Sequence, residues 1–238
     1  MTVLILQTGS APEQLRSRLG DFPQWFQRGL GLADADVTII DVQAGQQLPR
    51  PEHISAAVVT GSAAMVTQRH DWSERTAQWL VDAVRRNVPL LGVCYGHQLL
   101  AHALGGRVAD NPRGREIGTV RIDCLAPAAA DPLLAVAVGE FAAQATHVQT
   151  VVEPPANATV LARSSHDDFQ AVRYAKRAWG VQFHPEFSVA AMRGYLRLRA
   201  DTLRNEGLDA GRIGAAVRPS PRARTLLRRF LKCAGKNP

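Results

Sequence analysis

Three residues of this chain have side chains that can cleave an amide by covalent catalysis: Cys94, His184 and Glu186. A thiolate serves as the nucleophile, a histidine carries the proton that the reaction moves, and a carboxylate orients the histidine. His184 and Glu186 stand two residues apart, so in an extended backbone their side chains point the same way. Pro185 stiffens this segment. The trio predicts a Cys-His-Glu catalytic triad.

The residues around Cys94 predict a strand, a tight turn and a helix. Residues 88–93 are typical of a buried strand, and residues 97–104 have leucines at helical spacing before two terminating glycines. Gly92 and Gly96 flank the cysteine in the Gly-x-Cys-x-Gly form of a nucleophile elbow. The helix N-terminus would lower the pKa of the thiol. A cysteine alone is equally typical of inert packing, so the catalytic interpretation depends on the trio.

Two segments together carry a family resemblance: GVCYGHQLLAHALGG at residues 92–106 and GVQFHPEFS at residues 180–188. They resemble the class I glutamine amidotransferase family, particularly the amidotransferase portion of GMP synthase and its free-standing relatives. The motifs occur in the family's order, and the resemblance covers residues 1 to about 206. It implies a flavodoxin-like α/β fold and hydrolysis of the glutamine side-chain amide.

The resemblance also implies which groups would surround the substrate. The backbone N–H groups of Gly61 and Tyr95 would form the oxyanion hole, although TGSAAMV here lacks the double glycine common in the family. Gln149 replaces an aspartate that faces the synthetase in the family. Gln98 fits a substrate contact and a buried amide bonded to the backbone equally well. The implied substrate-binding residues are Gln98, Glu116, Thr146, His147 and Val148.

The implied reaction is attack of the Cys94 thiolate on glutamine, followed by hydrolysis of a γ-glutamyl thioester to release ammonia and glutamate. Three uses of such a site remain open. The protein could supply ammonia to a separate synthetase or ligase subunit, cleave γ-glutamyl peptides or conjugates, or act as a non-catalytic binding module. The complete trio argues against the last. A PfpI-type cysteine hydrolase shares the elbow but not the His-Pro-Glu segment.

Other residues predict neither a metal nor a cofactor. The three cysteines have no CxxC spacing, which argues against zinc and against a disulfide framework. His97 and His102 are five residues apart, so they do not converge on one side of a helix as a metal pair. The chain has no HExxH motif, no Walker loop and no complete dinucleotide fingerprint.

The net charge of +7 is concentrated at the C-terminal end. Residues 207–238 hold eight of the 28 Lys and Arg but one of the 21 acidic residues, so residues 1–206 carry 20 of each. We therefore expect an amidotransferase domain at 1–206 and a basic helical extension at 207–238 that packs on it, rather than a docking element or a nucleic-acid-binding domain. The absence of a signal pattern and of a long apolar run predicts a cytoplasmic protein without membrane contact.

The order of the elements predicts the fold class. Strands at 2–7, 37–42, 56–60 and 88–93 alternate with helices at 13–19, 21–30 and 72–87, which favours a doubly wound, mostly parallel sheet. Ser73 would cap the last of these helices, and Ser220 with Pro221 would begin a helix in the extension.

The second half of the chain predicts antiparallel strands added at the sheet edge. Residues 108–115 are expected to form a loop, and residues 125–145 only a short helix near 131–138. One amphipathic helix is expected over 190–205. The expected strands are 117–124, 147–153, 160–164, 169–174 and 179–183.

Overall fold

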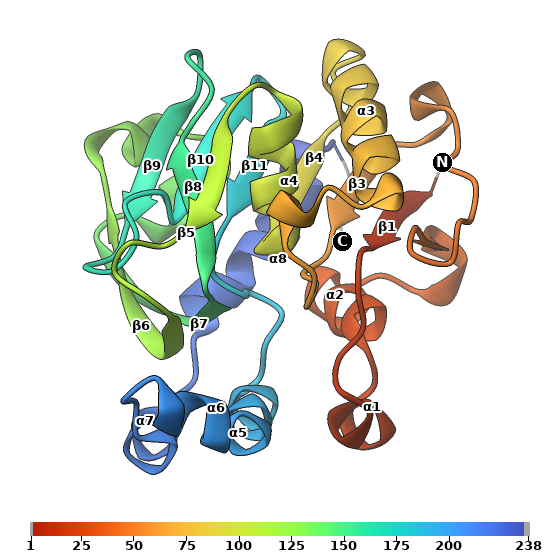
Figure 1. Cartoon of the computed structure of the whole chain (residues 1–238). Coiled ribbons are helices and arrows are strands. Elements are labelled where there is room, and N and C mark those ends of the chain that lie inside the picture. Colours follow the sequence, from red (N-terminus) through yellow and green to blue (C-terminus); the bar gives the residue numbers. More distant parts are fainter. Residues whose placement is uncertain (1, 236–238) are drawn as a thin grey trace.

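A nine-stranded sheet crosses the molecule and is parallel on one side and antiparallel on the other (Figure 1). The computed structural model describes residues 2–235. The strand order is β2-β1-β3-β4-β11-β10-β9-β6-β7, which confirms the predicted α/β class with its antiparallel edge. The parallel strands are β1 (Val3–Gln7), β2 (Val37–Asp41), β3 (Ala56–Val59), β4 (Leu90–Val93) and β11 (Ala178–Val181). The antiparallel strands are β6 (Glu116–Cys124), β7 (Glu140–His147), β9 (Thr159–Arg163) and β10 (Ala171–Ala175).

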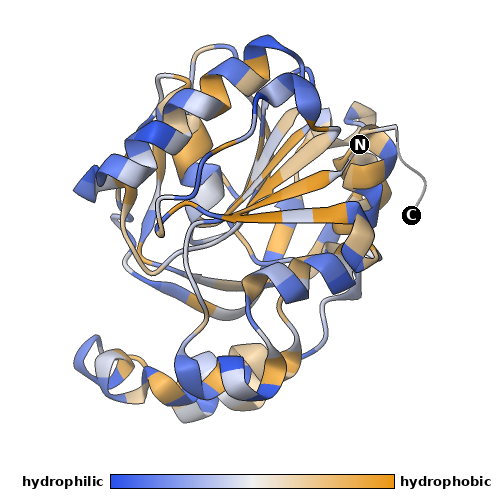
Figure 2. Ribbon diagram, turned by 90° about the vertical axis from the view of Figure 1, so that its right-hand side faces the viewer, coloured by the Kyte–Doolittle hydropathy of each residue, from blue (hydrophilic) through white to orange (hydrophobic). Residues whose placement is uncertain are grey.

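Helices cover both faces of the sheet, and each face has its own apolar core. Alternate side chains of β1 enter the two cores, Val3 and Ile5 on one face and Leu4 and Leu6 on the other. Figure 2 shows the apolar strands enclosed between helices. The first core is covered by α1 (Glu13–Leu19), α2 (Phe22–Leu30), α5 (Val189–Leu198) and α8 (Pro221–Cys233), and the second by α3 (Asp71–Arg85) and α4 (Tyr95–Ala103).

Short helices gather at the lower end of Figure 1. The prediction of one continuous helix over 190–205 is wrong. It is divided at Arg199 into α5 and α6 (Ala200–Asn205), and the apolar spacing continues across the break, so the pattern could not reveal it. α7 (Ala210–Ala216) was not predicted. Its N-terminus is capped by the Asp209 carboxylate, which accepts from two backbone N–H groups. No helix among residues 2–235 is long and apolar enough to cross a bilayer.

Two strands lie where none was predicted. β5 (Arg107–Asp110) occupies the expected loop and pairs antiparallel with β8 (Gln149–Glu153) in a separate two-stranded sheet. β7 occupies the alanine-rich stretch, beside the 3₁₀ turns Ala126–Ala130 and Leu134–Ala137 that replace the expected short helix. Alanine has little strand preference, so it is pairing with β6 along eight positions that makes β7 a strand.

Neither serine predicted as a helix cap has that role. Ser73 lies buried inside α3, and its hydroxyl bonds the Tyr95 hydroxyl at 2.6 Å. Ser220 occupies the N-cap position of α8, but its side chain makes no capping hydrogen bond. Its hydroxyl instead lies 3.5 Å from the Gln144 amide nitrogen. Pro221 is the first residue of α8, as predicted.

α8 buries the apolar face that its sequence predicted. Ala223, Leu227, Phe230 and Leu231 are fully buried, and Leu226 joins them. A Cβ on Gly29 of α2 would lie 2.3 Å from Leu227 Cδ1, so the missing side chain of that glycine lets the two helices approach closely. We propose that residues 207–235 form one folding unit with the preceding domain.

Leu227→Ala should therefore destabilise the whole protein. Removing this buried side chain should lower the free energy of unfolding by about 2–5 kcal/mol, because a cavity is left between α8 and α2. Urea denaturation measures the effect. Arg228→Ala, at the exposed neighbouring position, should stay within about 0.5 kcal/mol of the wild type. A wild-type urea midpoint for Leu227→Ala would contradict the packing of the extension.

Candidate active site

Cys94 stands at a sharp turn between β4 and α4. Its backbone has φ 52° and ψ −102°, a conformation that few residues other than glycine adopt. The Cys94 N–H donates to the Val181 carbonyl at 2.8 Å, and the Gly96 N–H donates to the Thr60 carbonyl at 3.1 Å. A Cβ on Gly96 would lie 2.4 Å from the Val59 carbonyl oxygen, so this position excludes any side chain. The predicted elbow is therefore present, with the cysteine at its apex.

His184 and Glu186 form a buried, hydrogen-bonded pair. His184 Nδ1 lies 2.7 Å from Glu186 Oε1, and the two residues are 3% and 2% exposed. The His184 N–H donates to the Gln144 carbonyl at 2.7 Å, which ties the segment to β7. Phe187 stacks on the imidazole with ring centroids 4.2 Å apart. These contacts hold the ring in one orientation.

Cys94 and His184 meet across Gly61, which follows β3. A Cβ on Gly61 would lie 3.0 Å from His184 Cε1 and 3.8 Å from Cys94 Cβ. Both residues therefore lie next to Gly61, and its missing side chain leaves room for the imidazole. The Gly61 carbonyl accepts from the Thr8 and Thr60 hydroxyls, each at 3.1 Å, which fixes the peptide. Three segments that are distant in the sequence therefore converge on one place.

The electrostatics of the pair favour a thiolate and an imidazolium. Burial opposes both charges, because it raises the pKa of a thiol and lowers that of an imidazole. The His184 cation nevertheless holds the pKa of Cys94 below its usual value. Against the same burial, Glu186 and then Cys94 raise the pKa of His184 to about 10. The cation beside it thus favours the thiolate form of Cys94.

A cavity opens beside the cysteine. It brings together most of the residues predicted to bind substrate: Gln98, Thr146, His147 and Val148, with Cys94 and Tyr95. Gly61 is absent from the lining, but the residues that follow it, 62–65, form one wall. Arg115 and Arg199 also line the cavity and were not predicted. In the segment of Arg115, the family resemblance implied a role only for the neighbouring Glu116. The position of Arg199 depends on the break between α5 and α6, which the sequence pattern does not reveal.

Gln98 and Gln149 are held by the protein itself. The Gln98 amide nitrogen donates to the Gln149 carbonyl at 2.7 Å and to the Gln182 side chain at 2.9 Å. The buried-amide interpretation of Gln98 therefore holds, while its side chain still reaches the cavity wall. The Gln149 amide donates to Thr67 and Asp110, so it braces the cavity rim.

Glu116 lies behind the cavity wall rather than on it. Its carboxylate accepts from His147 Nε2 at 2.9 Å, from the Ser164 hydroxyl at 2.7 Å and from the Gln170 amide. His147 Nδ1 faces the Gln149 carbonyl at 3.0 Å, so both ring nitrogens meet acceptors and both carry protons. Burial lowers the pKa of His147, but Glu116 outweighs it and the pKa is raised. Glu116 thus favours the cationic form of His147, and it does not line the cavity where substrate would bind.

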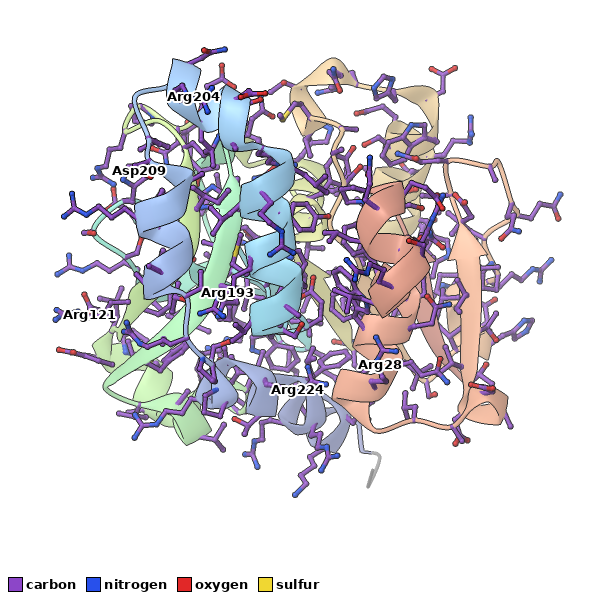
Figure 3. The ribbon with its side chains drawn as sticks, turned by 90° about the horizontal axis from the view of Figure 1, so that it is seen from below. Arg28, Arg121, Arg193, Arg204, Asp209 and Arg224 are labelled. Atoms are coloured by element: carbon purple, nitrogen blue, oxygen red, sulfur yellow. The ribbon has the colours of Figure 1, made fainter. Side chains whose placement is uncertain are left out.

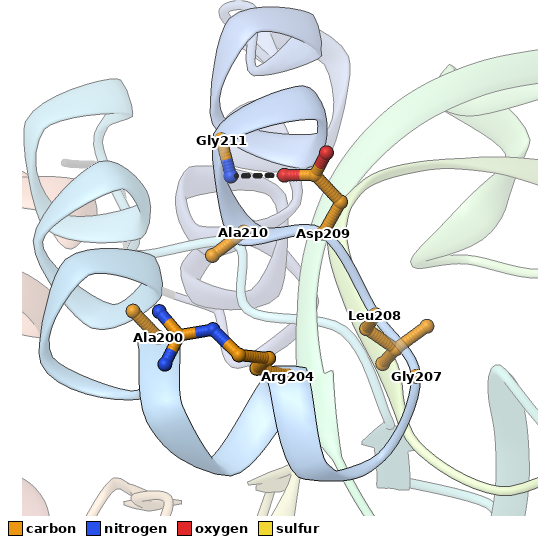
Figure 4. Close-up of a pocket in the computed structure, with 7 residues that line it drawn as sticks. All are labelled: Ala200, Arg204, Gly207, Leu208, Asp209, Ala210 and Gly211. Atoms are coloured by element: carbon orange, nitrogen blue, oxygen red, sulfur yellow. Dashed lines mark hydrogen bonds between the residues drawn. The ribbon is translucent and has the colours of Figure 1, made fainter.

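The hollow between α6 (Ala200–Asn205) and α7 (Ala210–Ala216) lacks such chemistry. This surface hollow is shown in Figure 4, and at its edge the Asp209 carboxylate caps α7 by accepting from the Gly211 N–H. No nucleophile or histidine lines it. Across residues 2–235, no three His, Cys, Asp or Glu side chains are grouped so that they could hold a metal ion.

Comparison with known proteins identifies the family of this chain. The family model of class I glutamine amidotransferases matches residues 21–199, so the chain belongs to that family. GMP synthase (glutamine-hydrolyzing) of Aeropyrum pernix is 33% identical over 160 residues, which are 67% of this chain and 29% of that protein. A glutamine-hydrolyzing GMP synthase subunit of Ignicoccus hospitalis is 34% identical over 140 residues, 58% of this chain and 71% of its own length. The chain thus spans less than a third of the Aeropyrum relative.

Solved structures share the fold. A glutamine amidotransferase from Thermotoga maritima superposes with a TM-score of 0.76 at 20% identity and covers 99% of both chains. A glutamine amidotransferase from Methylobacillus flagellatus gives a TM-score of 0.73 at 24% identity, over 98% of this chain and 92% of that one. The family membership makes class I glutamine amidotransferase the general class of this protein.

Labelling of Cys94 by iodoacetamide should set in at lower pH than labelling of the other two cysteines, because the His184 cation lowers the pKa of its thiol. Cys124 and Cys233 are internal controls: burial raises the pKa of both, so their labelling should rise steeply only at alkaline pH. In His184→Gln, burial of Cys94 acts without the cation, and labelling at pH 7 should fall at least about tenfold. Mass spectrometry assigns each adduct. A Cys94 profile that follows that of Cys233 would contradict the ion pair.

Proposed function

We propose that the protein hydrolyses the side-chain amide of glutamine through a γ-glutamyl thioester on Cys94 and so supplies ammonia. The observation that carries this proposal is the convergence of Cys94, which lines the cavity, with the buried His184–Glu186 pair beside it. The thiolate is the nucleophile and the imidazolium is the proton carrier. Glu186 orients the ring and stabilises its charge.

The reaction proceeds in two halves. The thiolate attacks the γ-carboxamide carbon, and the N–H groups of Tyr95 and Gly61 stabilise the oxyanion. The Tyr95 N–H is free for this role because it lies in the first turn of α4, where N–H groups have no acceptor within the helix. His184 gives its proton to the departing nitrogen, ammonia leaves and the thioester remains. His184 then takes a proton from water as the water attacks the thioester. Glutamate leaves, and the thiolate and imidazolium are restored.

The ammonia would pass to a separate synthetase or ligase subunit. Two relatives are named as one subunit of a glutamine-hydrolyzing GMP synthase, and they support this arrangement because a protein so named works with another. The acceptor itself is not specified by this cavity. Gln149 stands where the family has an aspartate that faces the synthetase, and its side-chain amide donates hydrogen bonds to Thr67 and Asp110. We therefore expect a synthetase contact that does not use a negative charge at this position.

Cys94→Ala should lower glutamate and ammonia release from glutamine at least about a thousandfold, because no other group can form the thioester. A coupled glutamate assay measures the loss, and Cys124→Ala should retain wild-type activity. Activity retained in Cys94→Ala would end the proposal.

The same assay separates the alternative uses of the site. Turnover of γ-glutamyl dipeptides far faster than of glutamine would indicate a γ-glutamyl peptidase instead. Silence toward every substrate, with or without a synthetase partner, would indicate a binding module.

Glu186→Gln should lower kcat for glutamine by about 10²–10⁴-fold, with a much smaller change in KM. The amide keeps the shape of the carboxylate but removes the charge that contributes most to raising the pKa of His184. The pKa of the imidazole, followed by NMR titration, should therefore fall in this variant. An unchanged kcat and an unchanged pKa would show that Glu186 does not act on His184.

A further inference from the structure

Phe187 covers the imidazole of His184 from the apolar core. The two rings are stacked, with centroids 4.2 Å apart and an angle of 29° between their planes. Both residues are buried, at 4% and 3% exposure, so water has little access to the imidazole. The Phe187 N–H also donates to the His184 carbonyl, at 3.4 Å, which keeps the two residues together in one turn of the chain. An aromatic ring, rather than solvent, therefore lies against the face of the imidazole.

Other aromatic rings hold Phe187 in place. Trp25 of α2 meets it edge to face, with centroids 5.3 Å apart, and the Tyr195 ring of α5 lies at 5.1 Å. Figure 3 shows these two helices from below, with Arg28 labelled on α2 and Arg193 on α5. Because rings from both helices contact it, Phe187 cannot turn away from the imidazole without disturbing the packing of this core.

The hydrogen bond to Glu186 does not by itself fix the plane of the imidazole. It holds the ring at one atom, Nδ1, which lies 2.7 Å from Glu186 Oε1. Stacking on a flat neighbour sets the tilt of the ring. The face of an aromatic ring is also negative, and it attracts a cation within about 6 Å of its centre, most strongly where water is excluded. A cationic His184 thus gains from Phe187 a stabilisation that a neutral His184 does not.

The charges around this ring do not all favour a cation. Burial lowers the pKa of His184, but Glu186 and then Cys94 raise it to about 10. The other charged or titratable side chains around the site are His147, Tyr195, Arg199 and Arg224. Tyr195 stays neutral, since burial raises its pKa. The remaining three carry or favour positive charge, so none of them helps His184 to hold its own.

We propose that Phe187 is a positioning residue of the site: its ring face stabilises the imidazolium of His184 and sets the plane in which Nδ1 meets Glu186. The kinetic consequence of this inference rests on the proposed function. In that reaction the imidazolium faces the thiolate and then gives its proton to the departing nitrogen. A ring that tilts away, or that loses its proton too easily, performs both tasks poorly.

Fluorinated phenylalanines at position 187 test the charge while nearly preserving the packing. Fluorine draws electron density from the ring face, so the attraction for a cation weakens as fluorines are added. Site-specific incorporation of monofluoro-, difluoro- and pentafluorophenylalanine should lower the pKa of His184 stepwise in an NMR titration, by about 0.5–1.5 for the last. The same pKa across the series would overturn the inference.

Kinetics of matched variants give a second test. Phe187→Leu removes the ring but keeps an apolar side chain, and kcat for glutamine should fall about 3- to 30-fold, with a smaller change in KM. Phe187→Tyr, which restores a ring face, should recover most of the loss. Phe141→Leu is the control, because Phe141 is 5% exposed in the same core but packs on Phe183. Its kcat should stay within about twofold of the wild type.

Thermal melting checks that each variant folds, and the fluorinated series decides alone if Phe187→Leu does not fold. Equal losses of kcat in Phe187→Leu and Phe141→Leu would reduce Phe187 to general packing and overturn the inference. An unchanged kcat in a folded Phe187→Leu would do the same.

Failure of the proposed function has a different signature. If the wild type releases neither ammonia nor glutamate from glutamine while the fluorinated series still shifts the pKa of His184, the role of Phe187 stands and the hydrolytic function fails. If the wild type hydrolyses glutamine, and neither the pKa of His184 nor kcat responds to changes at Phe187, the function stands and the role of Phe187 fails.

Discussion

Attraction between the Cys94 thiolate and the His184 imidazolium has to overcome a burial that opposes both charges, and the rest of the site depends on this balance. Glu186, itself buried, tips the balance by adding a negative charge on the far side of the ring. Such a network is stable only if its members cannot move apart. The fold supplies that restraint through the sheet.

The carboxyl ends of three adjacent parallel strands meet at this point. β3, β4 and β11 are neighbours in the sheet, and Gly61, Cys94 and His184 follow them within a few residues. Ligands of open α/β sheets bind at this edge. Close packing fixes the strands and the elbow helix together: a Cβ on Gly180 of β11 would lie 2.3 Å from His97 Nδ1 of α4. The glycines of the two motifs therefore serve the packing that aligns the reacting groups.

The antiparallel half of the sheet contributes the cavity wall. β6 and β7 run side by side, and their pairing brings Glu116 opposite His147. The Glu116 carboxylate thus lies behind the cavity wall and binds His147, which is part of the wall. Glu206 binds Arg115, another wall residue, in the same way. The wall is thus built from cations whose countercharges stand outside the cavity. Arg199 also lines the cavity, from the point where α5 gives way to α6.

The sequence by itself determined the parts whose signals are local. The apolar run before Cys94, the glycines around it and the two-residue spacing of His184 and Glu186 predicted the elbow and the pair, because each is a property of neighbouring residues. Tertiary structure decided what depends on contacts between distant residues. β7 is a strand because β6 pairs with it, Glu116 lies behind the wall because it is bound by His147, and Arg199 reaches the cavity because α5 ends there. A sequence pattern reports which way a side chain faces on its own element, whereas ion pairing and the packing of separate elements decide what that side chain meets.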